Sequence, residues 1–146
     1  MQNNRNDIGL LVLRLTTGGL IAFHGFSKIA SGIDGFQGMV EGLRLPLPTA
    51  FAWAVALFEL VGGLLVMAGF ATRWASMAFV ALFLGTTFYV KFGQMGAGLI
   101  SGDATAEADL LYLGAFAALA MLGAGAYSAD AKAGRETPAR SSVTVG

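Results

Sequence analysis

Four long apolar stretches, each about the length of a bilayer-spanning helix, dominate this sequence of 146 residues. A helix that crosses a bilayer needs roughly 20 apolar residues, because the hydrocarbon core is about 30 Å thick. Hydrophobic residues make up 55% of the chain and charged residues only 12%. We therefore predict an all-α fold, an integral membrane four-helix bundle. The expected spans are residues 8–30, 50–69, 74–92 and 107–127.

The predicted spans form one antiparallel up-down domain over residues 1–127, and the polar residues 128–146 are expected to be a flexible tail with no packed role. Residues 33–43 fit a short amphipathic helix at the membrane surface and fit a loop equally well. More lysine and arginine lies on the side of the two termini, which favours both termini in the cytoplasm. The basic residues of that side are Arg5, Arg73, Lys132, Arg135 and Arg140, against Lys28, Arg44 and Lys91 on the other side.

The residue counts exclude several classes of function. The formal net charge is zero, so the chain has no basic surplus with which to bind nucleic acid. It contains no cysteine, which excludes disulfides, thiolate nucleophiles and iron–sulfur clusters. His24 is the single histidine, which excludes a multi-histidine metal site built by one chain. We expect no metal, no covalently bound cofactor and no nucleic-acid partner.

Ionisable side chains inside the predicted spans are the main candidates for a functional site. Each one costs about 2.5–3.5 kcal/mol to insert into a bilayer, so a functional role is the default hypothesis. Five residues of the first span share one face, within a wedge of about 80° at ~100° per residue. They are Arg14, Thr17, Ile21, His24 and Lys28. Lys28 also fits an anchor at the membrane interface, and Arg14 fits a snorkelling side chain.

Glu59 lies near the middle of the second predicted span. Helical side chains lean toward the N-terminus of their own helix, so Glu59 and His24 lean toward each other on antiparallel helices. We expect Glu59 to lie closer to His24 than to Arg14. A Glu59–His24 pair would relay protons or hold a polar head group. The alternative is a protonated structural carboxyl that cross-links two helices.

Small residues in the first two predicted spans mark the places where these helices are expected to pack closely. They are Gly18, Gly19, Ala52, Ala56, Gly62 and Gly63. Glu107 and Asp109 open the last predicted span, where acidic side chains interact favourably with the helix dipole.

Four segments resemble the DoxX family of small four-helix membrane proteins. They are LRLTTGGLIAFHGFSK (13–28), LRLPLP (43–48), FELVGGLLVMAGFATR (58–73) and GAGAYSAD (123–130), in the order and spacing of the family. The resemblance implies a bacterial or archaeal inner-membrane protein. Some members of the family are linked to membrane oxidoreductase assemblies with quinone as acceptor. The matched polar positions are Arg14, His24, Lys28, Glu59 and Arg73.

The leading interpretation is a subunit or accessory of a quinone-linked redox assembly, rather than an autonomous enzyme. A polar site between the first two spans would hold a quinone, and a protein partner would carry the electron-transfer cofactor. One alternative is a small oligomeric proton-coupled transporter, which the midplane Glu59 and the similar segments 18–26 and 62–70 would suit. Another is a purely structural membrane scaffold. The expected surroundings are membrane lipid, with protein partners or further copies of the chain.

Overall fold

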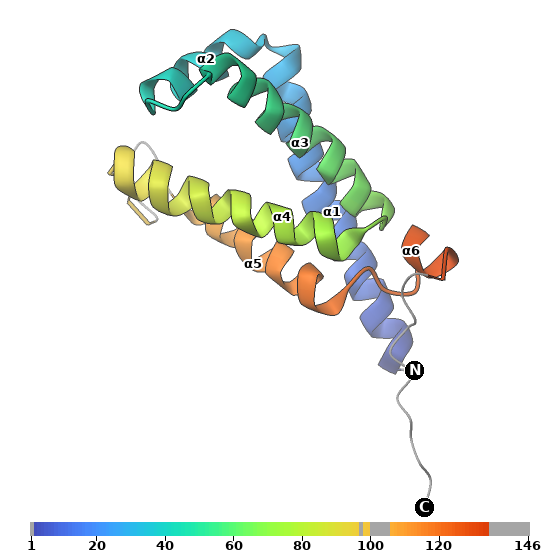
Figure 1. The fold of residues 1–146 in the computed structure, drawn as a ribbon. Helices are drawn as coiled ribbons and strands as arrows, with labels where there is room; N and C mark the ends of the chain where they lie inside the picture. The colour runs from blue at the N-terminus through green and yellow to red at the C-terminus, as the bar shows by residue number, and fades with distance from the viewer. Residues whose placement is uncertain (1, 97, 100–105, 135–146) are drawn as a thin grey trace, which may run out of the picture.

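The computed structural model describes residues 2–96, 98–99 and 106–134, and the regular structure in these residues is helical (Figure 1). A π-helical segment, η1, continues directly from α4. The helices are α1 (Gln2–Ala30), α2 (Ile33–Gly42), α3 (Pro48–Ala68), α4 (Thr72–Leu84), η1 (Gly85–Gln94), α5 (Glu107–Leu122) and α6 (Ala129–Lys132).

Within the described residues, three helices are long and apolar enough to cross a membrane: Asn4–Ala30, Pro48–Ala68 and Thr72–Gln94. The fourth predicted span, residues 107–127, corresponds to α5, which has 16 residues. At 1.5 Å per residue α5 is about 24 Å long, shorter than a hydrocarbon core of about 30 Å. The helix ends early because the chain turns at Gly123, whose φ is 81°. The predicted boundary at residue 127 is therefore wrong by about one turn.

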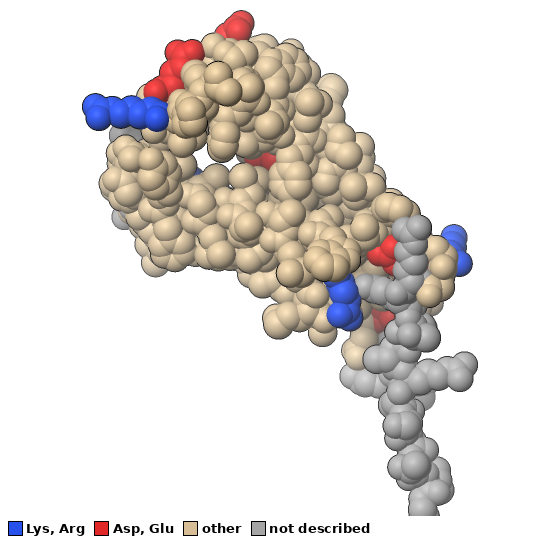
Figure 2. All heavy atoms as spheres, viewed as in Figure 1, with Lys and Arg blue, Asp and Glu red and all other residues tan. Residues whose placement is uncertain are grey.

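The surface of the long helices is strongly apolar. Many large hydrophobic side chains are exposed on this surface; Phe23, Trp74 and Leu111, for example, are 65%, 75% and 69% exposed. Figure 2 shows the charged side chains gathered near the two ends of the visible face, with a broad band of other residues between them. A contiguous apolar surface of this kind is unfavourable in water and suits contact with lipid.

The helices associate as two antiparallel pairs. In the first pair, α1 packs on α3 through glycine. A Cβ atom added to Gly63 would lie 2.7 Å from the Gly18 carbonyl oxygen and 2.6 Å from the Ala22 backbone nitrogen. The two backbones therefore approach as closely as only glycine allows, which confirms the predicted contact between these small residues.

In the second pair, α4 packs on α5 through aromatic rings. Phe79 stacks on Phe116 with 4.4 Å between ring centres, and Phe83 stacks on Tyr112 at 5.2 Å. Phe58 of α3 contacts Phe79 at 4.6 Å and joins the two pairs. The pairs diverge toward the end of the molecule that carries α2 (Figure 1), and Figure 2 shows a hollow there with an acidic side chain inside it.

Two segments outside the long helices were uncertain or differently predicted from the sequence. Residues 33–42 form helix α2, in which Val40 is buried, and Leu43 directly after it is buried too. Residues 128–134 correct the prediction of a flexible tail, because α6 packs against the turn between α3 and α4 (Figure 1) and Asp130 is 3% exposed. The rest of the predicted tail, residues 135–146, lies outside the described residues.

Candidate functional site

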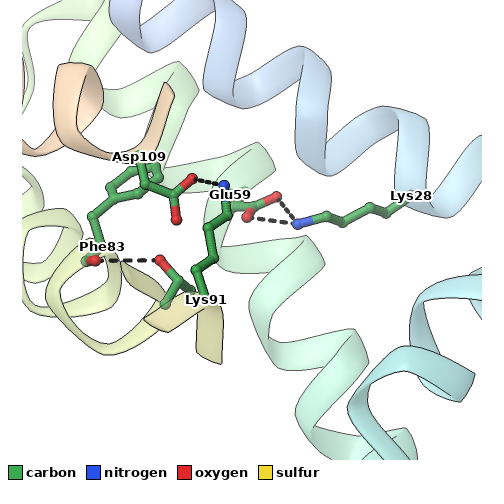
Figure 3. Close-up of polar contacts among 6 residues, drawn as sticks. Lys28, Glu59, Phe83, Lys91 and Asp109 are labelled. Atoms are coloured by element: carbon green, nitrogen blue, oxygen red, sulfur yellow. Dashed lines mark hydrogen bonds and ion pairs between the residues drawn. The ribbon is translucent and has the colours of Figure 1, made fainter. Parts of the chain in front are cut away.

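An ion pair between α1 and α3 is the centre of the candidate site. The Lys28 ammonium nitrogen lies 2.6 Å from both carboxylate oxygens of Glu59 (Figure 3). The side chains are 20% and 8% exposed, so the pair is largely withdrawn from the surface. Two short hydrogen bonds from an ammonium fit an ionised carboxylate, since charge-assisted bonds are the shortest of this type. The pair places opposite charges inside two segments that are apolar enough to span a membrane.

The partner of Glu59 follows from the direction of helical side chains. Helical side chains lean toward the start of their own helix, so Glu59 on α3 and the long side chain of Lys28 on the antiparallel α1 are expected to lean toward each other. The two meet one turn beyond His24, so the predicted Glu59–His24 pair is replaced by a Glu59–Lys28 pair. The interpretation of Lys28 as an interface anchor is incomplete, because its ammonium group binds a buried carboxylate.

Helix α2 contributes an aromatic ring to the same ammonium group. The Lys28 nitrogen lies 4.3 Å from the centre of the Phe36 ring, a distance at which the ring face attracts a cation. Phe36 is partly buried, and its helix packs on α3. The ion pair is thus covered on one side by the short surface helix.

A second ion pair joins the other two helices of this region. Lys91 of η1 lies 2.9 Å from a carboxylate oxygen of Asp109 at the start of α5 (Figure 3). Tyr112 lies one turn further along α5, and its ring stacks on Phe83 of α4 with 5.2 Å between ring centres. We call Lys28, Glu59, Lys91 and Asp109 the charged site.

A buried hydroxyl group lies beside the second pair. Thr87 precedes Lys91 by four residues on η1 and is 0% exposed. Its oxygen has no hydrogen-bond partner among the described residues. Buried polar groups are usually hydrogen-bonded, so this hydroxyl is a free polar group in an otherwise apolar helix face.

Arg14 belongs to a different cluster, near the middle of α1 and about four turns before Lys28. It is fully buried, and its guanidinium donates a hydrogen bond of 2.6 Å to the carbonyl oxygen of Tyr127. Gly69, whose φ is 74°, lies so close to the guanidinium that a Cβ there would overlap it. About two turns before Arg14 on α1, Asp7 accepts a hydrogen bond of 2.9 Å from the Ala126 backbone nitrogen. Arg14 therefore holds the chain that follows α5.

Asp130 completes this second cluster. Its two carboxylate oxygens accept hydrogen bonds from the backbone nitrogens of Ala71 and Thr72, at 2.9 and 3.0 Å. These donors are free at the start of α4 because the first N–H groups of a helix have no partner within it, and a carboxylate there also suits the helix dipole. We call this cluster the C-terminal clamp. It comprises residues 123–130 with Asp7, Arg14, Gly69, Ala71 and Thr72.

The structure separates the five residues predicted from the sequence. Lys28 and Glu59 come together, Arg14 lies in the C-terminal clamp, and His24 and Arg73 are exposed. The five residues that share one face in the sequence prediction are therefore not all buried, because His24 is exposed. The buried arc of α1 is centred on Gly18 and Gly25, and His24 lies at the rim of the predicted wedge, about 20° beyond Thr17.

Sequence reasoning missed three residues of these clusters. Asp109 was interpreted only as a favourable charge at a helix N-terminus, and Lys91 only as a flanking base. The available signal was the opposite charge of these two residues at the facing ends of neighbouring helices. Asp130 lies in the GAGAYSAD segment, where Gly123 and Gly125, both with positive φ, turn the chain back toward α1.

The helical fold, with three helices long and apolar enough to cross a membrane among the described residues, defines an α-helical membrane protein. The model of the DoxX family matches residues 9–91, more than half of the sequence. The chain belongs to the DoxX family. The family assignment agrees with the resemblance seen in the sequence segments, and the matched range includes both residues of the Lys28–Glu59 pair.

Two curated relatives are similar to the chain. "Putative oxidoreductase CatD" of Bacillus subtilis is 36% identical over 90 residues, which cover 61% of this chain and 64% of that protein. "Inner membrane protein YqjF" of Escherichia coli is 34% identical over 127 residues, which cover 85% of this chain and 91% of that protein. The alignment thus spans slightly less than two thirds of CatD. No solved structure matches the chain at a significant level.

Proposed function

We propose that this DoxX protein is an inner-membrane subunit of a quinone-linked redox assembly and that the charged site binds the quinone head group. The observation that most directly supports this proposal is the Lys28–Glu59 ion pair, held at 2.6 Å between two helices that are long and apolar enough to span a membrane. The electron-carrying cofactor would belong to a protein partner, because this chain has no cysteine and a single histidine.

The chemistry of the charged site suits a head group with two carbonyl oxygens. Lys28 and Lys91 each offer an ammonium donor, and Glu59 and Asp109 each offer a group that exchanges protons. Such charges act strongly in a low-dielectric surrounding. The hollow between the two helical pairs leaves this region less tightly packed than the glycine contact of α1 and α3 (Figure 2). The name of the CatD relative, which includes the word oxidoreductase, supports the redox direction.

The proposal includes a topology. α1, α3, α4 with η1, and α5 would form four crossings, the last of them a short helix with polar groups at its start. Both termini would face the cytoplasm, because basic residues are more numerous on that side. The inner membrane as the location is supported by the name of the YqjF relative.

The test is quinone retention by the purified protein. The full chain is produced in a quinone-containing bacterium and purified in mild detergent, and its organic extract is assayed for quinone by chromatography. We expect quinone in molar proportion to the native protein and less than about a tenth of it in Glu59→Gln and Lys28→Met, since a lost charged hydrogen bond weakens binding about tenfold or more. Asp34→Asn, an exposed carboxylate on α2, is the matched control and should retain the quinone.

Two results would contradict the proposal. Absence of quinone from the native protein, together with no binding of added quinone, would exclude a quinone site. Equal quinone in the native protein and in both variants, with a change only in thermal stability, would assign the ion pair to the structural scaffold instead.

A further inference from the structure

A groove between α1 and α5 lies next to the charged site and has no role in the function proposed so far. Its volume is about 370 Å³. Its walls include Thr16, Thr17 and Leu20 of α1 and Leu111, Tyr112 and Ala115 of α5. These two helices belong to different pairs, so they lie side by side without the close backbone contact that joins α1 to α3.

The groove is apolar and opens sideways. The hydroxyl groups of Thr16 and Thr17 donate to carbonyl oxygens of their own helix, at 2.9 and 2.5 Å, and offer little to a polar ligand. Leu20 and Leu111 are 58% and 69% exposed. Both belong to the apolar surface of the helices, so the mouth of the groove suits contact with hydrocarbon better than contact with water.

Tyr112 links the groove to the charged site. Its side chain lines the groove, and its ring also stacks on Phe83 in the core at 5.2 Å. Asp109 of the charged site lies one turn before Tyr112 on α5, and its neighbour Ala108 also lines the groove. The inner end of the groove thus leads toward the head-group position, while the outer end opens between the helices.

We infer that the α1–α5 groove binds the hydrocarbon tail of the quinone whose head group occupies the charged site. This inference rests on the proposed function and adds to it a lateral entrance and a second subsite. The ligand class is an amphiphile with an isoprenoid or alkyl chain, since the groove has apolar walls and no charged residue in its lining. A volume of this size lies at the lower end of typical ligand pockets, about 300–1,000 Å³, which fits the first part of a tail that continues into the lipid.

The test separates the tail from the head. Binding to the detergent-solubilised full chain is measured for two probes with the same head: a benzoquinone without a side chain and its decyl derivative. We expect the decyl probe to bind the native protein at least about tenfold more tightly, since several methylene groups gain burial in the groove. Ala115→Phe fills the groove and should remove this advantage while the tailless probe binds as before.

The matched control is Ala78→Phe, which adds the same ring to an exposed alanine of α4 away from the groove. It should leave the tail advantage unchanged, whereas Glu59→Gln should weaken both probes equally. The inference is overturned if Ala115→Phe leaves the tenfold difference intact, or if it weakens both probes alike. Failure of both probes to bind the native protein would instead overturn the proposed function.

A photoactivatable tail identifies the occupant directly. A decyl-type quinone with a diazirine on its tail should label peptides of α1 and α5, and excess unlabelled quinone should suppress the labelling. Labelling of the same peptides by a photoactivatable phosphatidylcholine, with no competition from quinone, would assign the groove to a membrane phospholipid and overturn the inference.

Discussion

The C-terminal clamp and the charged site both keep charged side chains within the protein, but they satisfy those charges in different ways. In the clamp, Arg14 and Asp130 bind backbone groups of other segments. In the charged site, Lys28 and Glu59 bind each other. A backbone group stays where its helix puts it, so the clamp holds segments in register. A pair of side chains can exchange partners with a ligand that offers equivalent hydrogen bonds.

The packing around the two clusters differs in the same sense. Arg14 and Asp130 are 0% and 3% exposed, whereas the side chains of Lys28 and Lys91 retain 20% and 24% exposure. The clamp lies where α1, the α3–α4 turn and the chain after α5 meet (Figure 1). The charged site lies where the two helical pairs separate. Tight contacts to backbone groups thus hold the clamp together, whereas the looser side-chain pairs lie at the end where we propose that a ligand binds.

The largest expected effect is the loss of Arg14. Arg14→Leu removes a charged hydrogen bond from a fully buried guanidinium to the Tyr127 carbonyl group, so the free energy of unfolding should fall by about 3 kcal/mol. Unfolding in mixed micelles with increasing sodium dodecyl sulfate measures this change. Arg5→Leu, an exposed arginine of the same helix, is the control. Equal small losses in the two variants would show that the clamp does not hold the fold.

The next effect is expected at the other side of the clamp. Asp130→Ala removes the acceptor for two backbone N–H groups at the start of α4, which should cost about 2 kcal/mol in the same unfolding assay. Asp130→Asn keeps one acceptor oxygen and should recover about half of the loss. Quinone retention by both folded variants should match that of the native protein. A selective loss of quinone without a loss of stability would contradict the division between the two clusters.

In the charged site, replacing both partners should restore the stability that replacing one partner removes. The clamp offers no such double variant, because its charged side chains bind backbone groups. Lys28→Met or Glu59→Leu alone leaves one buried charge without its partner and should destabilise the protein by about 2 kcal/mol. The double variant should recover to within about 1 kcal/mol of the native stability, because an apolar pair replaces the ion pair. Quinone should be lost from all three. Additive destabilisation in the double variant would show that the two residues do not act as a pair.

The smallest effect is expected at the residue that the sequence ranked highly and the structure leaves outside both clusters. His24→Ala should change the free energy of unfolding by less than about 0.5 kcal/mol, as for other exposed positions. It should also leave quinone retention unchanged, as measured in the purified protein. A loss of quinone comparable to that in Glu59→Gln would restore His24 to the site and show that a partner or a second copy covers it.

Periodicity predicted much of this arrangement. The apolar stretches predicted the long helices α1, α3 and α4 with η1, and the paired glycines predicted where α1 and α3 meet. The ionisable residues Glu59 and Lys28 were both identified as candidates from their position inside apolar spans. The pairing between them was not, because a helical wheel gives the direction of a side chain and not its reach along the helix axis.

The end of α5 and the role of residues 128–134 could not be predicted from sequence patterns either. Gly123, Gly125 and Gly134 have positive φ and turn the chain, but a glycine in the sequence does not reveal the direction of the turn. The polar composition of the tail predicted solvent exposure. Asp130 is buried all the same, because the unpaired N–H groups of α4 offer it two hydrogen bonds.

The sequence by itself determined the environment of this protein and the class of its fold. Hydrophobic length and the scarcity of charge require membrane-spanning helices, and these are local properties of the chain. Only the tertiary structure decided which charges meet. Arg14, His24 and Lys28 share one side of α1, yet the neighbours of that helix assign them to a clamp, an exposed rim and an ion pair. The physical reason is that a charge in an apolar surrounding takes the partner within reach, and reach is set by how the helices pack.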